Sequence, residues 1–528
     1  MHSSKKMLFV GTISLVLAPY LVGAAGGCSQ DLTGAYVVTN NSGRYDPNSL
    51  VSCIDEANAE VYGRVIFDSS MDIALYEEMY LDNDNVTVDA QEHIINISNN
   101  GERIVNVFND GVLTLKGVNI VNAEVNNLSD SLINIYTASL VLDNVTIANN
   151  TLTSDAYNLI KATSSTVTIQ NDSNISQNNS NFTLIEVVDS NITISDSILN
   201  NNITQDDSDS SIISVRGSNL SITNSEVNEN EPKNYVLEAE SRSTGPGAPS
   251  IPSNVDITDS TFSTNTSNSS PVYIRSSSIS INNSTISNNN NTGEGGGGLS
   301  LSSSSVVLNN SSISNNNSDD NGGGLSLYSS SLALTNTTIS GNSASMSGGG
   351  IYSTLSSVNI KNSTITENTA IFGGGIYAYW QNSINILNTT ITNNSVTVSG
   401  GGIYSYENYD VNISNTILSG NMTSNSSADA NEIRSLGYNI FGAVTSFTDE
   451  SQQPSDIITL DPKLDPLADN GGDTQTHALQ KDSPAIDAGY STIPLDQRGE
   501  DRDSSPDIGA YEYQSLGTIV PIINYLLF

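Results

Sequence analysis

The sequence predicts an all-β protein, a single-stranded right-handed parallel β-helix of about a dozen coils of roughly 26 residues with N- and C-terminal caps. Three observations predict this fold. Glycine clusters recur at a nearly fixed period, aliphatic residues keep step with them, and no apolar period of 3.6 residues is present. The segments between the glycines are rich in Ser, Thr and Asn, which excludes a solenoid of α-helices.

The repeat is clearest between residues 298 and 421. The last glycines of successive clusters are 26, 26, 25 and 27 residues apart, at Gly298, Gly324, Gly350, Gly375 and Gly402. An apolar file has the same spacing, namely Ile313, Ile339, Ile365, Ile391 and Leu418. A first Asn column comprises Asn310, Asn336, Asn362, Asn388 and Asn415. A second Asn column comprises Asn316, Asn342, Asn368, Asn394 and Asn421.

The alternation of apolar and polar residues explains why these columns predict stacked strands. In Val358-Asn359-Ile360, for example, two apolar side chains share one face of a short strand. Such a strand is too short for a sheet of its own, so equivalent strands of successive coils must stack, about 4.7–4.9 Å apart. The apolar file is then expected to point inward and form one continuous core.

Both Asn columns are expected at bends of the coil. Asn tolerates the left-handed backbone region, and stacked amides can hydrogen-bond from coil to coil as a ladder. The glycine clusters supply further positive-φ positions at another corner. We therefore assign structural roles to these residues and expect no catalytic residue among them.

The N-terminus is typical of an exported protein. Lys5 and Lys6 precede an apolar run and small residues, so residues 1–24 are interpreted as a signal peptide and 25–63 as an N-terminal cap. Two readings of Cys28 remain open. The favoured one is a structural disulfide with Cys53, and the alternative is lipidation of Cys28, although Ala25-Gly26-Gly27 lacks the Leu expected before such a site.

Charge narrows the functional classes. The net charge of −39, from 56 acidic and 17 basic residues, argues against binding to nucleic acid or to anionic membranes. The three His are not clustered, and no calcium-loop pattern is present, so we expect no metal site and no cofactor.

The repeat unit and both ends of the chain resemble known families. The units Gly-Gly-Gly-Ile-Tyr and Asn-Thr-Thr-Ile-Ser-Gly-Asn (336–342) resemble the β-helix repeats of pectin-lyase-like and polymorphic outer-membrane proteins, and place the β-helix at 64–445. The stretch 53–58 resembles the cap that opens many such bacterial surface proteins. Residues 446–514, with Asp-Asn-Gly-Gly (469–472), Ser-Pro-Ala-Ile-Asp-Ala-Gly (483–489) and Asp-Gln-Arg-Gly (496–499), resemble a choice-of-anchor Q domain.

This resemblance implies a bacterial cell-surface, outer-membrane or secreted protein, and no established enzymatic activity. We read residues 446–514 as a cap over the open end of the β-helix, which would otherwise expose strand edges. His477, Asp496 and Arg498 are interpreted as buried polar anchors of that cap. Residues 515–528 form an apolar tail that is too short for a transmembrane helix.

The sequence is compatible with three functions. The favoured one is a non-catalytic adhesin, envelope scaffold or displayed antigen, with a host, cell-surface or glycan ligand and an oligomeric state that the sequence does not indicate. The alternative is a polysaccharide lyase or hydrolase, but its candidates Lys161, Glu186, Arg216 and Arg275 lie at different offsets from their neighbouring apolar pairs and are not expected to converge. A minor alternative is flat-face binding of ice or glycan through hydroxyl ranks at Ser312/Ser314, Thr338/Ser340, Thr364/Thr366 and Thr390/Thr392.

Overall fold

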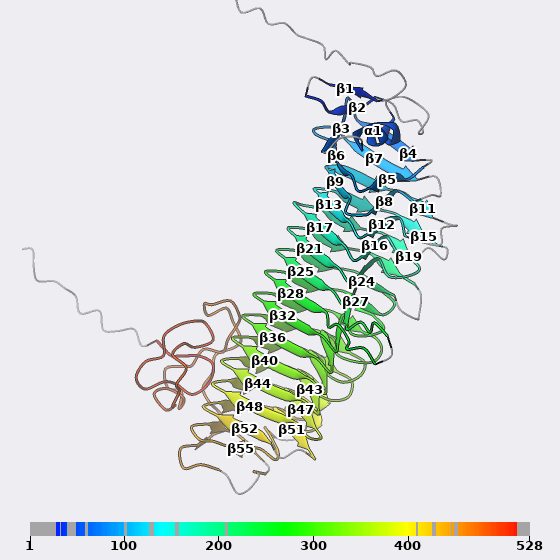
Figure 1. Cartoon of the computed structure of the whole chain (residues 1–528). Helices are drawn as coiled ribbons and strands as arrows, with labels where there is room; N and C mark the ends of the chain where they lie inside the picture. The colour runs from blue at the N-terminus through cyan, green and yellow to red at the C-terminus, as the bar shows by residue number, and fades with distance from the viewer. Residues whose placement is uncertain are drawn as a thin grey trace, which may run out of the picture.

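The computed structural model confirms the fold class. The chain forms a right-handed parallel β-solenoid of about 14 turns, drawn out as a rod in Figure 1. The structure describes residues 28–31, 33–39, 49–58, 62–75, 77–99, 103–125, 131–153, 158–205, 210–245, 247–407, 410–424, 429–444, 446–447 and 452–514. The expected signal peptide (1–24) and apolar tail (515–528) lie outside the described residues.

Three long sheets form the sides of the rod. Along most of the rod, each coil contributes one strand to each sheet. Sheet A contains β1 (Ser29–Gln30), β2 (Tyr36–Val38), β3 (Gly63–Phe67), β6 (Asn85–Asp89), β9 (Val112–Lys116), β13 (Ser139–Asp143), β17 (Thr166–Gln170), β21 (Asn191–Ser195), β25 (Asn219–Thr223), β28 (Asn254–Thr258), β32 (Ser278–Asn282), β36 (Ser305–Asn309), β40 (Ser331–Thr335), β44 (Ser357–Lys361), β48 (Ser383–Leu387), β52 (Val411–Ser414) and β55 (Arg434–Ser435).

Sheet B contains β4 (Met71–Leu75), β7 (Ile95–Asn99), β10 (Val118–Val121), β14 (Thr146–Ala148), β18 (Asn174–Ser176), β22 (Ile198–Asn200), β26 (Glu226–Asn228), β29 (Thr261–Ser263), β33 (Thr285–Ser287), β37 (Ser312–Ser314), β41 (Thr338–Ser340), β45 (Thr364–Thr366), β49 (Thr390–Thr392), β53 (Ile417–Leu418), β56 (Ile440–Phe441) and β57 (Ile457–Ile458).

Sheet C contains β5 (Met79–Asp82), β8 (Val105–Phe108), β12 (Ile133–Tyr136), β16 (Ile160–Thr163), β20 (Ile185–Val188), β24 (Ser211–Arg216), β27 (Tyr235–Glu240), β31 (Val272–Arg275), β35 (Leu299–Ser302), β39 (Leu325–Tyr328), β43 (Ile351–Thr354), β47 (Ile376–Tyr379) and β51 (Ile403–Tyr406).

Two short sheets cover the corner between sheets B and C. One contains β11 (Glu124–Val125), β15 (Thr151–Leu152), β19 (Asn179–Ser180) and β23 (Ile203–Thr204). The other contains β30 (Thr266–Ser267), β34 (Asn290–Asn291), β38 (Asn317–Ser318), β42 (Ser343–Ala344), β46 (Thr369–Phe372), β50 (Ser395–Ser399) and β54 (Met422–Thr423).

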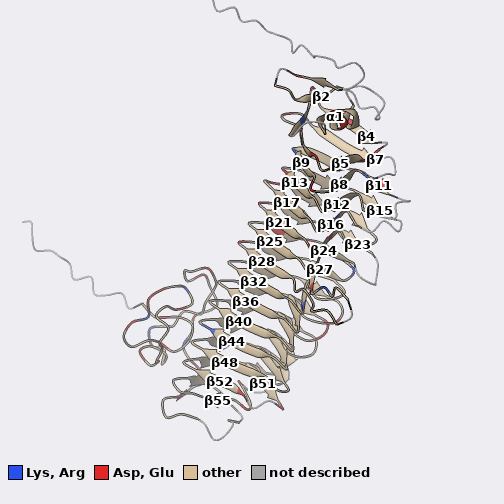
Figure 2. Cartoon of the chain, viewed as in Figure 1, with Lys and Arg blue, Asp and Glu red and all other residues tan. Residues whose placement is uncertain are grey.

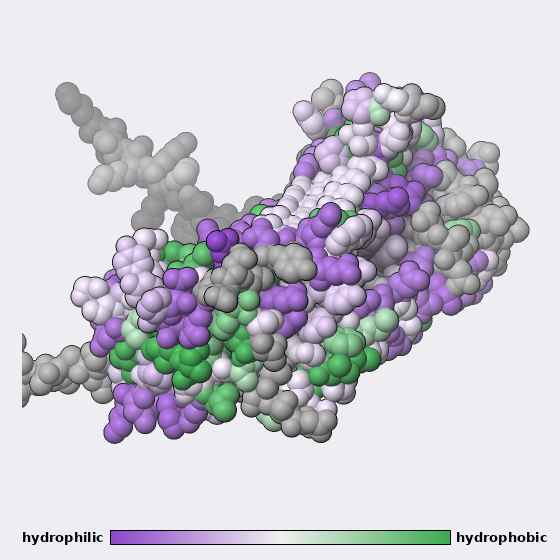
Figure 3. Space-filling model, turned by 90° about the horizontal axis from the view of Figure 1, so that it is seen from below, coloured by the Kyte–Doolittle hydropathy of each residue, from purple (hydrophilic) through white to green (hydrophobic). Residues whose placement is uncertain are grey.

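The inward side chains form one continuous core. Ile313, Ile339, Ile365, Ile391 and Leu418 are paired strand to strand in sheet B, and all of them are fully buried. Ser and Thr fill many outward positions, and a flat band of weakly polar residues runs along the rod (Figure 3). The 26-residue period therefore holds the coils in register through stacked aliphatic side chains.

The two Asn columns behave differently. In the first column all five residues have positive φ, but the amide chain is broken after Asn336, because the Asn362 amide donates instead to the Leu495 carbonyl. The second column is a continuous buried ladder in which each amide donates to the Asn of the next coil, and it runs through Asn150, Asn178, Asn202, Asn230, Asn265, Asn289, Asn316, Asn342, Asn368, Asn394 and Asn421 to Asp429.

The glycine clusters meet two separate demands. The first glycine of a triplet takes positive φ, as Gly348 does at 70°. The third packs against the next coil, because a Cβ at Gly350 would lie 2.6 Å from the Gly375 carbonyl oxygen. Left-handed backbone and close coil-to-coil approach thus both require glycine at this corner.

The N-terminal end is closed by a small cap. β1 and β2 are antiparallel, β2 pairs in parallel with β3, and α1 (Leu50–Ala57) packs across them. Ser49 caps the helix by accepting a hydrogen bond from the Ser52 backbone N–H. Leu50 and Ile54 are buried on the inner face of α1, which covers the apolar end of the core.

Most of the C-terminal segment, residues 452–514, does not lie where we expected a cap. After β57 it turns back and packs along the flank of the rod, beside coils β40 to β52 (Figure 1). Hydrogen bonds link it to residues more than a hundred positions earlier, such as Thr338 to Gln475 and Thr364 to Gln497. Residues 460–514 therefore cover a side of the last coils, whereas β57 stacks on β56 at the end of sheet B.

Candidate functional site

The C-terminal segment covers part of the outer face of sheet B. Thr338, Thr364 and Thr390 point outward from β41, β45 and β49, and each is at most 1% exposed. The Thr338 and Thr364 hydroxyls bond to Gln475 and Gln497, and the Thr390 hydroxyl accepts from the Ala510 N–H. We call this covered surface, together with Asn362, Asn388 and Asn415, the docking face.

This arrangement corrects the flat-face hypothesis. Ser340, Thr366 and Thr392, the other hydroxyls of these ranks, are also buried. Only Ser312 and Ser314, one coil upstream, stay half-exposed. The hydroxyl ranks therefore bind the chain's own C-terminal segment over three coils, because four of their hydroxyls form hydrogen bonds with it, namely those of Thr338, Thr364, Thr366 and Thr390.

The expected polar anchors lie inside the docked segment. Nδ1 of His477 is 2.8 Å from the Asp465 carbonyl oxygen, and its Nε2 is 3.0 Å from Oγ1 of Thr366. Burial lowers the pKa of His477, so the ring is held neutral. The fully buried Asp496 forms an ion pair with Arg498 at 2.8 Å. These residues fix the segment to itself and to the rod.

A second buried ion pair lies deeper in the segment. Arg502 and Glu512 are 3.1 Å apart, and each side chain is 2% exposed. Burial raises the pKa of Asp507 to about 6, against the lowering effect of the backbone N–H groups of Tyr513 and Asp487. Figure 2 shows charged residues frequent in this segment and sparse along the adjoining coils.

The charged residues of sheet C converge, contrary to our expectation. Lys161 pairs with Glu186 in the strand register, and Glu186 and Glu238 flank Ser214 in the same outward file. Arg216 and Arg275 belong to the neighbouring file, with Glu240 between them. We call these six charged residues, Lys161, Glu186, Arg216, Glu238, Glu240 and Arg275, the charged row.

Distances show that the charged row is a set of ion pairs between coils. The Lys161 ammonium is 3.8 Å from Glu186, and the Arg216 guanidinium lies between Glu186 at 3.7 Å and Glu238 at 4.0 Å. Arg275 is 3.6 Å from Glu240. Each cation is thus adjacent to a carboxylate of a neighbouring coil.

Glu238 is the most enclosed carboxylate of the row. Its side chain is 4% exposed, and Oε2 accepts a hydrogen bond of 3.1 Å from the Ser214 hydroxyl. Tyr235 and Tyr273 stack beside it with ring centroids 4.8 Å apart. Burial, followed by the nearby Tyr273 and Glu238, raises the pKa of Tyr235 to about 12, so this phenol stays protonated.

The charged row was not predicted from the sequence, because residue offsets were measured from the apolar pairs of sheet A and not from the strands of sheet C. Lys161, Glu186 and Glu238 each follow directly an aliphatic residue of sheet C, namely Ile160, Ile185 and Leu237. The apolar pairs used in the sequence belong to sheet A, and the connections between the two sheets vary in length. Counting from the sheet C aliphatics would have found the convergence.

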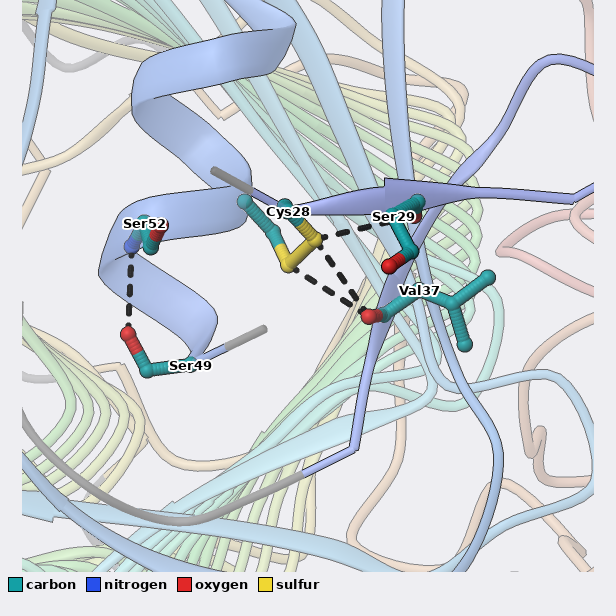
Figure 4. The surroundings of a disulfide bond; sticks show 6 residues. Cys28, Ser29, Val37, Ser49 and Ser52 are labelled. Carbon is teal, nitrogen blue, oxygen red and sulfur yellow. Dashed lines mark hydrogen bonds between the residues drawn. A yellow bond between two sulfur atoms is a disulfide. The ribbon is translucent and has the colours of Figure 1, made fainter. Parts of the chain in front are cut away.

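The two cysteines are joined in the N-terminal cap. Cys28 and Cys53 form a disulfide with Cα atoms 4.8 Å apart, and both residues are buried (Figure 4). It fastens the first described residues to α1 beside the Val37 carbonyl. An acylated Cys28 would have no thiol for this bond, so the two readings exclude each other.

Within the described part of the chain, no group of three or more His, Cys, Asp or Glu side chains is placed to hold a metal ion. The only helix among these residues is α1, and none is long and apolar enough to cross a membrane.

Comparisons with known proteins show similarity in the β-helix. A family model described as "Right handed beta helix region" matches residues 250–391 and 298–442. No curated protein matches the chain. Among solved structures, pectate lyase Pel9A is 14% identical over 91% of this chain and 96% of its own, with a TM-score of 0.28. The periplasmic alginate epimerase AlgG is 12% identical over 71% of this chain and 76% of its own, also with a TM-score of 0.28. The family model spans β28 to β56. The sequence repeat, the structure and this match agree that these coils form a right-handed β-helix region.

Proposed function

We propose that the chain is an exported, non-catalytic rod that presents the outer face of sheet C for binding, as an adhesin, envelope scaffold or displayed antigen. The N-terminal leader pattern supports export, and the buried disulfide suits an oxidising compartment. The resemblance of residues 446–514 to a choice-of-anchor Q domain supports a bacterial cell envelope or the medium as its location.

The charged row is the observation that carries the non-catalytic role. A lyase needs a basic group that can lose its proton, but Arg216 lies between two carboxylates and Lys161 beside one. Both cations are thus engaged in ion pairs with carboxylates of neighbouring coils and are not unpaired bases. The row is suited to recognising a ligand by fixed charges, and a host, cell-surface or glycan ligand fits that role.

Location is tested by expressing the full chain with its leader in a bacterial host. We expect the mature protein in the envelope or medium, with Cys28 oxidised to Cys53 by mass spectrometry of the N-terminal peptides. Recovery only in the cytoplasm, with residues 1–24 retained, would contradict export.

A second candidate, a polysaccharide hydrolase, is favoured by one observation. Glu186 and Glu238 lie two strand steps apart in one file, about 9.5 Å by strand spacing. Carboxyl groups about 6.5–9.5 Å apart are typical of inverting glycosidases.

Activity separates the two candidates. Under the non-catalytic proposal, polygalacturonate, alginate and neutral glucans yield neither unsaturated products nor new reducing ends. Release of reducing ends that is lost in Glu238→Gln but kept in Glu226→Gln, a carboxylate of sheet B, would establish the hydrolase instead.

A further inference from the structure

An aromatic patch occupies sheet C toward the C-terminal end of the rod. Tyr352, Tyr377 and Tyr404 pair strand to strand in one outward file, and Tyr379 and Tyr406 do so in the next. The patch, which we call the tyrosine strip, consists of Tyr328, Tyr352, Phe372, Tyr377, Tyr379, Trp380, Tyr404 and Tyr406. It lies on a face that the docked C-terminal segment does not cover (Figure 1).

The fold does not require aromatic residues at these positions. In the two preceding coils the file of Tyr352 carries Ser300 and Ser326, and the strands pair in the same register. The strip nevertheless contains the only Trp of the chain, and Trp380 is 46% exposed. Tyr328 and Tyr406 are 54% and 44% exposed. Clustered exposed aromatics of this kind mark interaction surfaces.

The rings are arranged as a shingled stack. Tyr352, Tyr377 and Tyr404 have successive ring centroids 5.5 Å apart, with interplanar angles of 6° and 13°. The inner ring thus has another ring on each face, and its outward contacts are its edge and hydroxyl. The stack ends at Ser326 on one side and at β51, the last strand of sheet C, on the other. Within this file, only the end rings Tyr352 and Tyr404 lack a neighbouring Tyr on one face.

The surroundings of the strip are acidic. Residues 276–433 contain eight acidic residues and a single basic one, Lys361, which lies on sheet A. Arg275 lies two strand steps before Tyr328 in the same outward file, where it is 3.6 Å from Glu240. Asp320 acts electrostatically on Tyr352, and Glu432 on Tyr404. Burial, with neighbouring tyrosines, raises the pKa of Tyr377 to about 12, so its phenol is neutral and accepts hydrogen bonds.

We propose that the tyrosine strip is a docking surface for a basic polypeptide, whose Lys and Arg side chains contact the phenol oxygens, the end-ring faces and the acidic rim. This inference rests on the proposed binding role and names its partner class. Charge complementarity selects the partner, because the rim attracts cations and repels anions. Cations bind to tyrosine faces, and guanidinium and ammonium groups donate to phenol oxygens.

A neutral glycan is the competing occupant, and the stack disfavours it. Sugars need open ring faces for stacking, and at the centre of the strip neighbouring rings cover both faces of Tyr377. The charged row lies on earlier coils of the same sheet, from β16 to β31, so its variants do not alter the strip.

The test compares the full-length oxidised chain with the double variant Tyr377→Ser/Tyr404→Ser. Serine occupies the same file in earlier coils, so the variant is expected to keep the melting temperature and circular dichroism of the parent. The matched control is Tyr80→Ser/Tyr136→Ser, which removes aromatics from sheet C near the N-terminus. Fluorescently labelled deca-arginine, deca-glutamate and neutral oligosaccharides are titrated by anisotropy at low and high ionic strength.

We expect the strip variant to bind deca-arginine about tenfold more weakly than the parent, a loss of about 1.4 kcal/mol. The control should stay within about twofold, and salt should weaken parental binding. Equal deca-arginine affinity in parent and strip variant would overturn the inference, as would strip-dependent binding of neutral oligosaccharides. Either result leaves the non-catalytic rod standing, whereas cleavage of polysaccharide would overturn that proposal without bearing on the strip.

Discussion

Along the last coils of the rod, the outer faces of sheets B and C carry opposite kinds of side chain. Sheet B presents Thr338, Thr364 and Thr390, and its own C-terminal segment covers them. Sheet C presents Tyr377 and Tyr404, and it stays open. Small hydroxyls allow a backbone to approach closely and be hydrogen-bonded, whereas large rings hold a partner at a distance. The same coil thus builds an internal interface on one side and, as we propose, a recognition surface on the other.

Removing the C-terminal segment, which covers sheet B but not sheet C, should have the largest effect on stability. A chain ending at Leu460 loses the hydrogen bonds to the docking face and the apolar cluster of Ile417, Leu479 and Ile508. At about 1 kcal/mol net per hydrogen bond, we expect the free energy of unfolding to fall by about 5 kcal/mol or more. Urea unfolding followed by circular dichroism measures it, and increased dye binding would report the exposed cluster. An unchanged midpoint would mean that the segment is not docked in solution.

The second largest effect should be the difference in stability between breaking an ion pair inside the docked segment and breaking one on the open face of sheet C. Arg502→Met leaves Glu512 buried without its partner, which should cost about 3–5 kcal/mol. Lys161→Met, on the open face, breaks a pair whose side chains are 33% and 19% exposed and should cost less than about 1 kcal/mol. Urea midpoints of both variants compare the two environments. Similar losses would show that the docked segment excludes water no better than the open face.

The sequence predicted the rod better than it predicted what covers the rod. The file of Ile339 and Ile365 follows from a period that local strand geometry imposes, so pattern alone locates it. The partner of Thr364 does not follow, because Gln497 is 133 residues away and an outward Thr looks alike whether covered or open. The charged row was missed for a related reason, since loops of variable length separate the sheets and conceal the offset that its members share.

Single hydroxyls should show a smaller version of the same contrast. Thr364→Val removes the donor to Gln497 inside the docking face, and an unsatisfied buried acceptor should cost about 1–2 kcal/mol. Thr168→Val, an outward residue on the open face of sheet A, should change stability by less than about 0.5 kcal/mol. Paired thermal melts measure both. A costly Thr168→Val would indicate that outward hydroxyls stabilise the strands themselves and not the docking.

The smallest expected effect is a pH dependence of docking that originates in His477. Its folded-state pKa lies below 6.5, because burial opposes the charge more than the Asp465 carbonyl and Glu367 favour it. Above pH 6.5 the ring is neutral both docked and undocked, so it contributes nothing to the pH dependence. As the pH falls below 6.5, the undocked ring takes up a proton that the docked ring resists, and docking weakens.

Asp507, with its pKa raised to about 6, acts in the opposite direction, because acid between about pH 6 and 3.8 favours its docked form. His477→Gln should therefore remove the loss of thermal stability just below pH 6.5 and leave the acid-side gain of Asp507. If the variant and the parent instead lost stability in parallel, the proton would be taken up elsewhere, and the docking face would be insensitive to the charge of His477.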